Sequence, residues 1–212
     1  MIAGRFIALE GGEGAGKSTQ ARLLRDELAA QGIEAVLTRE PGGTPGAEAI
    51  RGLLLDPPGE GWGAETEALL FAAARADHVG RLIRPALAAG RWVICDRFLD
   101  STRAYQGGGG GLPEADILSL HRIGSGGLLP DLTLLVEVSP EAAQARLSAR
   151  DAGGSDAIGG RDAAYHARVA AAFARMAQAE PQRFARIDGE GAAEQVHARI
   201  MDVLAPLLKA RR

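Results

Sequence analysis

Short runs of apolar residues alternate along this 212-residue chain with longer segments in which apolar positions recur every three or four residues. The short runs predict β-strands, and the longer segments predict amphipathic α-helices. The predicted strands span residues 5–10, 34–39, 91–96, 132–138 and 184–188. The predicted helices span roughly residues 17–31, 45–55, 64–89, 113–124, 140–150, 162–178 and 192–209.

The predicted strands are apolar at consecutive positions, as in residues 132–136, rather than at alternate positions. This pattern is typical of parallel strands that helices cover on both faces of the sheet. Because strands and helices alternate along the chain, we predict an α/β fold with a doubly wound, five-stranded parallel sheet. The chain shows neither a repeat nor a linker, so we expect one domain over residues 1–212.

Two segments break the alternating pattern. Residues 106–112 contain five consecutive glycines, and residues 151–160 are rich in Gly, Ala, Ser and Asp. We expect both segments to be irregular surface loops, because loops tolerate such sequences.

Composition restricts the partners that this chain can have. The formal net charge of −3 gives no general attraction to nucleic acid or membranes, and we expect neither as a partner. The single cysteine, Cys95, excludes an intramolecular disulfide and argues against a cysteine-based zinc site. The chain has no apolar stretch long enough to span a membrane and no apolar N-terminal targeting segment, so we expect a cytoplasmic protein.

The most specific motif follows the first predicted strand. Residues 11–18 read Gly-Gly-Glu-Gly-Ala-Gly-Lys-Ser and match the phosphate-loop pattern G-x-x-x-x-G-K-[ST]. In such a loop, backbone N–H groups and the N-terminus of the next helix face the phosphate oxygens. Lys17 would reach the β- and γ-phosphates, and the Ser18 hydroxyl would bind Mg²⁺. The alternative, a glycine-rich turn that contains Lys-Ser by chance, does not explain the strand before it and the helix after it.

Three other clusters suggest a second substrate. Asp96 and Arg97 end the third strand, where they could hold Mg²⁺ and a phosphate or simply form an ion pair. Residues 39–44 (Arg-Glu-Pro-Gly-Gly-Thr) end the second strand, where Pro-Gly-Gly could form a rigid turn that a ligand approaches closely or simply a turn between elements. Phe71 and Arg75 share one helix face and could hold a base. Spacing alone favours the simpler alternative, in which Phe71 is a core residue and Arg75 a solvated neighbour.

These motifs occur in the same order and at the same spacing in bacterial thymidylate kinases, which the chain resembles over essentially its whole length. The most specific strings are residues 39–44 and Ser-Thr-Arg-Ala-Tyr-Gln-Gly at 101–107, and Pro-Asp-Leu-Thr at 130–133 also fits. The resemblance implies a P-loop nucleoside monophosphate kinase fold with a small lid. It also implies transfer of the γ-phosphoryl group of ATP to the 5′-phosphate of dTMP, with Mg²⁺ as cofactor. The family resemblance further implies a homodimer, and the predicted helix 64–89 could supply its interface.

The resemblance assigns a role to each matching residue. ATP would bind Gly11, Gly12, Glu13, Gly14, Ala15, Gly16, Lys17, Ser18 and Thr19. The dTMP pocket would contain Glu40, Pro41, Phe71, Arg75, Arg97, Ser101, Thr102, Tyr105 and Gln106. Within it Phe71 would stack on thymine, Arg75 and Thr102 would bind the base edge, and Tyr105 would pack against the deoxyribose. Ser18 and Asp96 would hold Mg²⁺, while Lys17, Glu13 and Arg97 would act in catalysis.

The lid departs from the family pattern. Members without arginine in the phosphate loop carry a catalytic arginine in the lid, within an Asp-Arg-apolar-Glu string. We expect the lid at about residues 150–162, where the matching string reads Asp-Ala-Ile-Gly at 156–159. Because residue 157 is alanine, Arg150 is our first candidate for the catalytic arginine and Arg161 the second. Arg146 lies further back on the preceding helix.

Two competing functions remain open. A kinase for dUMP, CMP or a guanine nucleotide would share the mechanism, and a regulatory ATPase would need no acceptor pocket. Other classes lack their motifs. A GTPase switch needs asparagine, which this chain does not contain, and a dinucleotide-binding site needs glycine where Lys17 stands. No serine occurs in the G-x-S-x-G motif of hydrolases.

Overall fold

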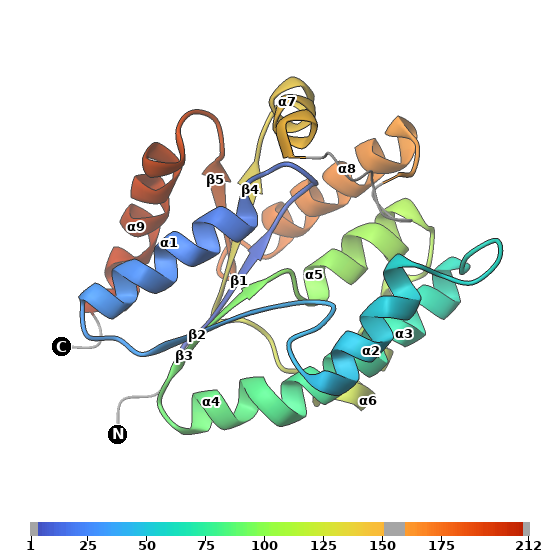
Figure 1. Cartoon of the computed structure of the whole chain (residues 1–212), viewed down its shortest axis with the longest axis horizontal. Coiled ribbons are helices and arrows are strands. Elements are labelled where there is room, and N and C mark those ends of the chain that lie inside the picture. Colours follow the sequence, from blue (N-terminus) through green and yellow to red (C-terminus); the bar gives the residue numbers. More distant parts are fainter. Residues whose placement is uncertain (1–3, 151–159, 210–212) are drawn as a thin grey trace.

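The computed structural model describes residues 4–150 and 160–209. Its strands form one parallel sheet in the order β2-β3-β1-β4-β5 (Figure 1). The strands are β1 (Phe6–Glu10), β2 (Ala35–Arg39), β3 (Trp92–Asp96), β4 (Leu132–Glu137) and β5 (Phe184–Asp188). The predicted fold class is confirmed, and each predicted strand matches an observed one within a residue at either end.

Helices cover both faces of the sheet, and β1 shows why its residues are apolar at consecutive positions. Ile7 and Leu9 pack against α1 (Lys17–Ala30) and α9 (Ala193–Lys209) on one face. Phe6 and Ala8 point to the other face, into a core with Val79. Because both faces are buried, polar residues are excluded from every position of this strand except its carboxyl end.

The remaining helices surround the carboxyl ends of the strands or cover the second face. They are α2 (Pro45–Leu55), α3 (Ala64–His78), α4 (Arg84–Ala88), α5 (Leu99–Thr102), α6 (Glu114–Ser125), α7 (Pro140–Arg150) and α8 (Ala163–Ala179). The predicted helix 64–89 is continuous but not uniform, because a π-helical turn at Val79–Ile83 joins α3 to α4. This turn ends two residues before Pro85, whose missing N–H interrupts α-helical hydrogen bonding.

The prediction of an irregular surface loop at residues 106–112 is wrong. Its first part belongs to a π-helical segment, η2 (Arg103–Gly109), which continues α5 and packs against α8. A Cβ atom at Gly108 would lie 2.4 Å from Cβ of Ala172, and one at Gly109 would lie 2.5 Å from the Tyr165 ring. The glycines therefore allow two helical segments to approach closely. Most of the other predicted loop, residues 151–159, lies outside the described residues.

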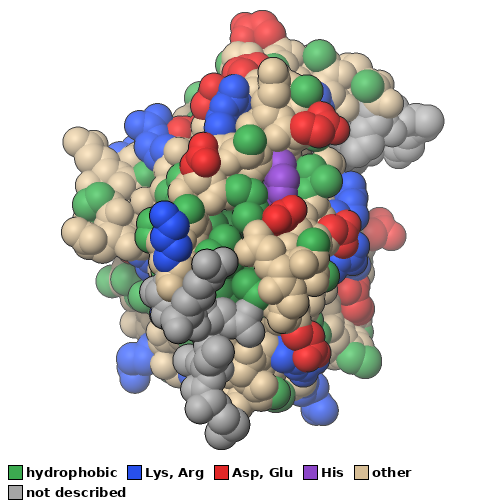
Figure 2. Space-filling view, turned by 90° about the vertical axis from the view of Figure 1, so that its left-hand side faces the viewer, with side chains coloured by type: hydrophobic (Ala, Val, Ile, Leu, Met, Phe, Trp, Pro, Cys, Tyr) green, Lys and Arg blue, Asp and Glu red, His purple; other side chains and the backbone are tan. Residues whose placement is uncertain are grey.

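The described surface carries several large exposed apolar side chains: Leu53, Leu69, Leu118, Ile123 and Leu129. The face that carries both ends of the chain in Figure 1 shows acidic and basic side chains around a central group of hydrophobic ones (Figure 2). Within residues 4–150 and 160–209, none of the helices combines the length and the apolar character needed to cross a membrane.

Candidate functional site

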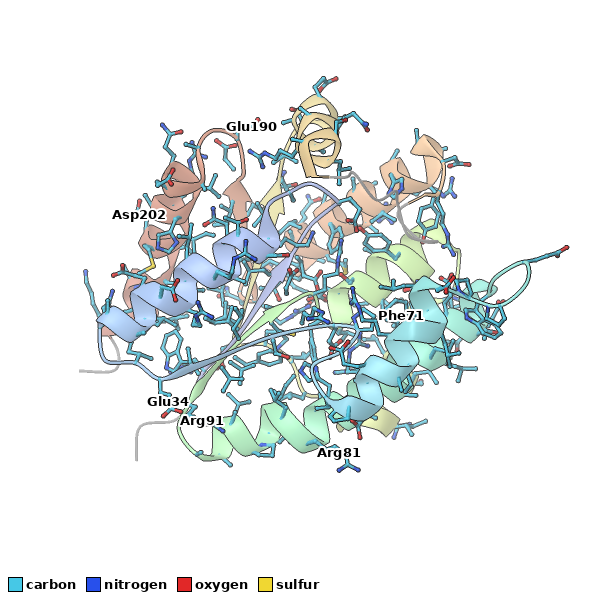
Figure 3. All side chains as sticks on the ribbon, in the orientation of Figure 1. Glu34, Phe71, Arg81, Arg91, Glu190 and Asp202 are labelled. Carbon is cyan, nitrogen blue, oxygen red and sulfur yellow. The ribbon has the colours of Figure 1, made fainter. Side chains whose placement is uncertain are left out.

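A cleft of about 690 Å³ lies at the carboxyl ends of β1, β2 and β3. Phe71, labelled in Figure 3, lines the cleft from α3. Most of the residues that the sequence singled out line this one cleft: Glu13, Gly14, Gly16, Lys17, Ser18, Thr19, Glu40, Pro41, Phe71, Arg75, Asp96, Arg97, Ser101, Thr102, Tyr105 and Gln106. The position agrees with the rule that ligands of α/β folds bind where parallel strands end.

The phosphate loop connects β1 to α1. Gly16 caps α1 in the left-handed conformation, with φ 91°, which a side chain would disfavour. The buried Lys17 donates from Nζ to the backbone oxygens of Gly11 (3.1 Å) and Gly12 (2.6 Å). Its burial, together with the nearby guanidinium of Arg97, lowers the pKa of Lys17 to about 8. A phosphate group beside this amine would stabilise its charged form.

Ser18 and Asp96 meet where α1 begins and β3 ends. The register pairs Leu9 of β1 with Asp96, and the Ser18 hydroxyl donates to Oδ2 of Asp96. Among the described residues, no group of three or more His, Cys, Asp and Glu side chains could hold a metal ion. The pair nevertheless fits Mg²⁺, which commonly takes one or two protein ligands and completes its coordination with water and substrate phosphates.

Arg97 lies between the phosphate loop and the rest of the cleft. It is the one non-glycine residue of the described chain with a positive φ, at 69°. Its guanidinium donates to Gly11 O (3.1 Å), Ser101 Oγ (3.1 Å) and Glu13 Oε1 (2.6 Å). The same group lies 5.0 Å from the centre of the Tyr105 ring. A strained backbone of this kind is typical of functional sites, and here it accompanies a guanidinium that contacts the phosphate loop.

Arg75 is buried, so the alternative interpretation of a solvated arginine is wrong. Its Nε donates to Oε2 of Glu40 at 2.7 Å, and its Nη2 donates to Thr102 Oγ1 at 2.9 Å. His78 hydrogen-bonds the second oxygen of Glu40 at 3.0 Å and Thr38 Oγ1 at 2.8 Å. Glu40 itself follows β2 and is 5% exposed. The carboxylate therefore fixes the guanidinium at the wall of the cleft.

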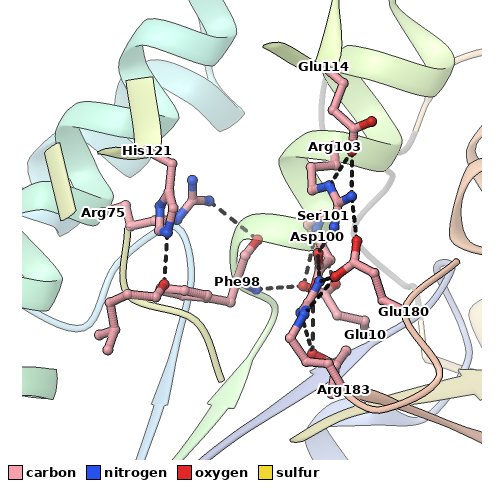
Figure 4. Close-up of polar contacts among 12 residues, drawn as sticks. Glu10, Arg75, Phe98, Asp100, Ser101, Arg103, Glu114, His121, Glu180 and Arg183 are labelled. Carbon is pink, nitrogen blue, oxygen red and sulfur yellow. Dashed lines mark hydrogen bonds and ion pairs between the residues drawn. The ribbon is translucent and has the colours of Figure 1, made fainter. Parts of the chain in front are cut away.

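Glu10 is a second buried carboxylate, which the sequence analysis did not single out. It accepts hydrogen bonds from Phe98 N (2.8 Å), Ser101 N (3.1 Å) and Ser101 Oγ (2.6 Å), as Figure 4 shows. Burial, reinforced by the charge of Asp100, raises its pKa to about 7. Glu10 thus holds Ser101, which in turn accepts a hydrogen bond from Arg97. The sequence feature that could have identified Glu10 is a charged residue at the end of an otherwise apolar strand.

Asp100 lies next to this network and is fully buried (Figure 4). Burial opposes its ionisation, but hydrogen bonds and charges from Arg183 and Arg103 outweigh burial and lower its pKa. Arg183 donates from Nη1 at 2.6 Å and Arg103 from Nη1 at 2.9 Å. The cluster ties α5 to the turn before β5, and we infer a structural role for it.

The candidate lid arginines occupy different environments. Arg161 is not among the residues that line the cleft; it pairs with Glu67 and donates to Tyr165 Oη at 2.7 Å. Arg146 does line the cleft, where it donates to Gly189 O at 2.8 Å and Ala15 O at 3.4 Å. Arg150 ends α7, but its side chain and residues 151–159, including Ala157, lie outside the described part of the chain.

Several cleft residues were given no role by the sequence. They are Arg22, Arg51, Leu55, Phe98 and Leu147. Arg39 and Arg146 also line the cleft, although the sequence drew attention to Arg39 only as part of the motif at 39–44 and to Arg146 only as a residue behind the lid. Arg51 illustrates the reason, because α2 brings its guanidinium back to Pro41 O at 2.8 Å. The arginines add positive charge to a cleft that already contains Lys17, Arg75 and Arg97. Such charge favours a ligand with several phosphate groups.

Comparison with known proteins agrees with this geometry. A model of the thymidylate kinase family matches residues 9–200. The chain is 56% identical over 205 residues to a thymidylate kinase of Rhizorhabdus wittichii, covering 97% of this chain and 99% of the relative. It is 48% identical over 208 residues to a thymidylate kinase of Caulobacter vibrioides, covering 98% and 99% of the two chains. The crystal structure of thymidylate kinase from Ehrlichia chaffeensis superposes with a TM-score of 0.78 at 32% identity, covering 95% of this chain and 99% of that one.

Proposed function

The chain belongs to the thymidylate kinase family, and on this basis we propose how its cleft transfers the γ-phosphoryl group of ATP to the 5′-phosphate of dTMP. The observation that supports the assignment most directly is the continuity of the cleft. The phosphate loop lies at one end, Phe71 and Arg75 lie at the other, and Arg97 connects the two ends through its contacts with Glu13 and Tyr105. A regulatory ATPase would not need the second end.

At the donor end, the phosphate loop from Gly11 to Thr19 would hold ATP. Lys17 would exchange its backbone acceptors for phosphate oxygens and carry positive charge to them. Ser18 and Asp96 would hold Mg²⁺, which supplies charge stabilisation to the transferred phosphoryl group. Arg146, which contacts the carbonyl of Ala15 in the loop, would lie beside the donor nucleotide.

At the acceptor end, the ring of Phe71 would stack on thymine, while Arg75 and Thr102 would bind the edge of the base. Tyr105 would pack against the deoxyribose. Its ring lines the cleft and lies 5.0 Å from the Arg97 guanidinium, and its hydroxyl is buried. The remaining pocket residues, Glu40, Pro41, Ser101 and Gln106, line the same end of the cleft.

Phosphoryl transfer requires positioning and charge stabilisation more than covalent chemistry. Arg97 would bind the acceptor phosphate and Glu13 would help to orient the reacting groups. The lid arginine is the remaining component, and we propose Arg150 for this role. Arg161, the second candidate from the sequence, pairs with Glu67 outside the cleft and would assist only by leaving that pair. Arg150→Ala should lower kcat by at least about a hundredfold, because such arginines contribute several orders of magnitude. A kcat within about twofold of the parent would exclude Arg150.

We also propose that two copies of the chain form a homodimer. Leu69 on α3 (56% exposed) and both Leu118 and Ile123 on α6 (41% and 74%) are large exposed apolar side chains. These helices pack directly against each other, with Gly124 facing Ala72 and Ala76. The neighbouring helices could therefore present one apolar surface. Light scattering should report a dimer for the parent and a monomer for Ile123→Asp, with Asp202→Ala on α9 as the control.

The reaction uses ATP, and we propose that the enzyme works in the cytoplasm, where ATP and nucleoside monophosphates are supplied. The acceptor assignment is tested by ADP release from Mg-ATP with dTMP, dUMP, CMP, AMP or GMP. We expect fast release with dTMP and slower release with dUMP, because one methyl group contributes about 1–3 kcal/mol. Phe71→Ala should raise KM for dTMP but not for ATP. ADP release that does not depend on any acceptor would support a regulatory ATPase instead.

A further inference from the structure

Glu67 is a buried carboxylate for which the mechanism above has no use. It lies on α3, one turn before Phe71, and is 4% exposed. Both of its oxygens are occupied by partners from other elements: Oε2 accepts a hydrogen bond from Gln106 Nε2 at 2.9 Å, and Oε1 pairs with Arg161. A carboxylate is rarely buried unless it is paired, and Arg161 supplies the opposite charge.

The contact with Glu67 decides the orientation of the Gln106 amide. An ionised carboxylate can only accept hydrogen bonds, so Gln106 must turn its NH₂ group toward Glu67 and its oxygen away. The two orientations of a side-chain amide occupy nearly the same space, so packing does not choose between them and a hydrogen-bond partner must. Gln106 lines the cleft, and in the described part of the chain no hydrogen bond reaches its Oε1. The cleft therefore presents a hydrogen-bond acceptor at this position.

We propose that Glu67 is a positioning residue for base specificity: by fixing the amide of Gln106, it selects a pyrimidine with an N–H donor at ring position 3. This proposal rests on the proposed function, since it needs a nucleoside monophosphate in the pocket. Thymine and uracil carry that N–H, whereas cytosine has an acceptor there. A pocket built to pair with a polar group of the correct ligand strongly rejects an analogue that leaves its own groups unpaired.

Arg75 lies on the same helix and contributes to the same selection. Its guanidinium can only donate, which suits the carbonyl oxygen at position 4 of thymine and not the amino group of cytosine. Removing the constraint on Gln106 would therefore weaken the discrimination without abolishing it. The measurement that isolates Glu67 is the ratio of kcat/KM for dTMP to kcat/KM for dCMP.

Glu67→Gln provides the direct test, because glutamine has nearly the same shape but both accepts and donates. The Gln106 amide could then turn over, and we expect the ratio to fall at least about tenfold, mostly through KM. Glu65→Gln, at an exposed position of the same helix, is the matched control and should leave the ratio unchanged. Glu67→Asp still only accepts and should keep the ratio within about twofold.

A purely structural role for Glu67 predicts a different result. Kcat/KM for both substrates would then fall together in Glu67→Gln while the ratio stayed constant, and this outcome would overturn the proposal. A double-mutant cycle adds a second criterion. Gln106→Leu alone should lower the ratio by a similar factor, and adding Glu67→Gln to it should change the ratio no further. A lower ratio in the double variant than in Gln106→Leu would contradict the proposal that Glu67 acts through Gln106.

The test must also allow for a Glu67→Gln variant that does not fold and for a parent enzyme that does not phosphorylate dTMP. If Glu67→Gln does not fold, Gln106→Leu decides, because an unchanged ratio in that variant would exclude any role for the Glu67 contact in specificity. If the parent enzyme does not phosphorylate dTMP in the same assay, the proposed function is wrong and this inference fails with it. If the parent enzyme phosphorylates dTMP but Glu67→Gln leaves the dTMP-to-dCMP ratio of kcat/KM unchanged, the inference about Glu67 is wrong while the proposed function stands.

Discussion

The two ends of the cleft are built in different ways. The donor end is a short continuous stretch from Gly11 to Thr19 whose ligand-facing groups are largely backbone. The acceptor end is assembled from side chains of α3, α5 and η2, and buried carboxylates hold them in place. Glu40 holds Arg75, Glu67 holds Gln106, and Glu10 holds Ser101. The donor end thus depends on local sequence, whereas the acceptor end depends on ion pairs and hydrogen bonds between distant elements.

The largest expected effect comes from removing the charge at the donor end. Lys17→Met should lower kcat by about a thousandfold, because charge stabilisation of the transferred phosphoryl group would be lost. The affinity for dTMP, measured by calorimetry, should change by less than about threefold. Lys209→Met replaces the other lysine of the chain and should have no effect. A loss of dTMP affinity as large as the loss of kcat would show that the two ends do not act separately.

At the acceptor end, we expect a substitution to affect stability as well as binding. Glu40→Gln leaves the Arg75 guanidinium buried without its opposite charge, and should lower the free energy of unfolding by about 2–3 kcal/mol. KM for dTMP should rise at the same time. The comparison is Glu48→Gln, which breaks the exposed pair with Arg39 and should cost less than about 1 kcal/mol. If denaturant titrations gave the same loss of unfolding free energy for Glu40→Gln and Glu48→Gln, the buried carboxylate would contribute no more to stability than the exposed one.

The smallest expected effect is a pH dependence that Glu10 alone introduces. Burial raises its pKa in the folded protein to about 7 from 4.5, so the folded state binds more protons than the unfolded state between these values. Its contribution to stability is therefore present below pH 4.5 and is lost as the pH rises to about 7. Replacement by glutamine removes this titration.

The free energies of unfolding of the parent and Glu10→Gln should consequently differ by an amount that depends on pH. From pH 5 to pH 8 the difference should shift in favour of the variant, by on the order of 2 kcal/mol. Glu141→Gln, at an exposed position on α7, provides the control and should follow the parent at every pH. A constant difference for Glu10→Gln would mean that Glu10 is already ionised across this range.

The sequence predicted the fold and the position of the phosphate loop between β1 and α1, because both depend on residues that are close together in the chain. Apolar periodicity located the sheet, and the motif around Lys17 needs only its own strand and helix. Arg75 shows the limit of this reasoning. Its spacing from Phe71 was compatible with both a binding role and a solvated position, and only its contact with Glu40, 35 residues away, separates them.

Glu10 and Glu67 could not be predicted, because their partners Ser101 and Gln106 lie 91 and 39 residues away. The glycine run at 106–112 was interpreted wrongly for a related reason. Composition favours a loop there, but the packing of Gly108 and Gly109 against α8 requires small residues inside a helical segment. Local patterns contain no information about which element will pack against them.

The environment of Lys17 also distinguishes it chemically from the other lysine of the chain. The chain has two lysines, and Lys209 is exposed at the end of α9, whereas Lys17 is buried with its pKa lowered to about 8. Acylating reagents attack the neutral amine, so mildly alkaline solution activates Lys17 well before an ordinary lysine. A nucleotide in the phosphate loop would recharge the amine and shield it. The ratio of labelling at Lys17 to labelling at Lys209, read by mass spectrometry, would then report occupancy of the donor end without any engineered probe.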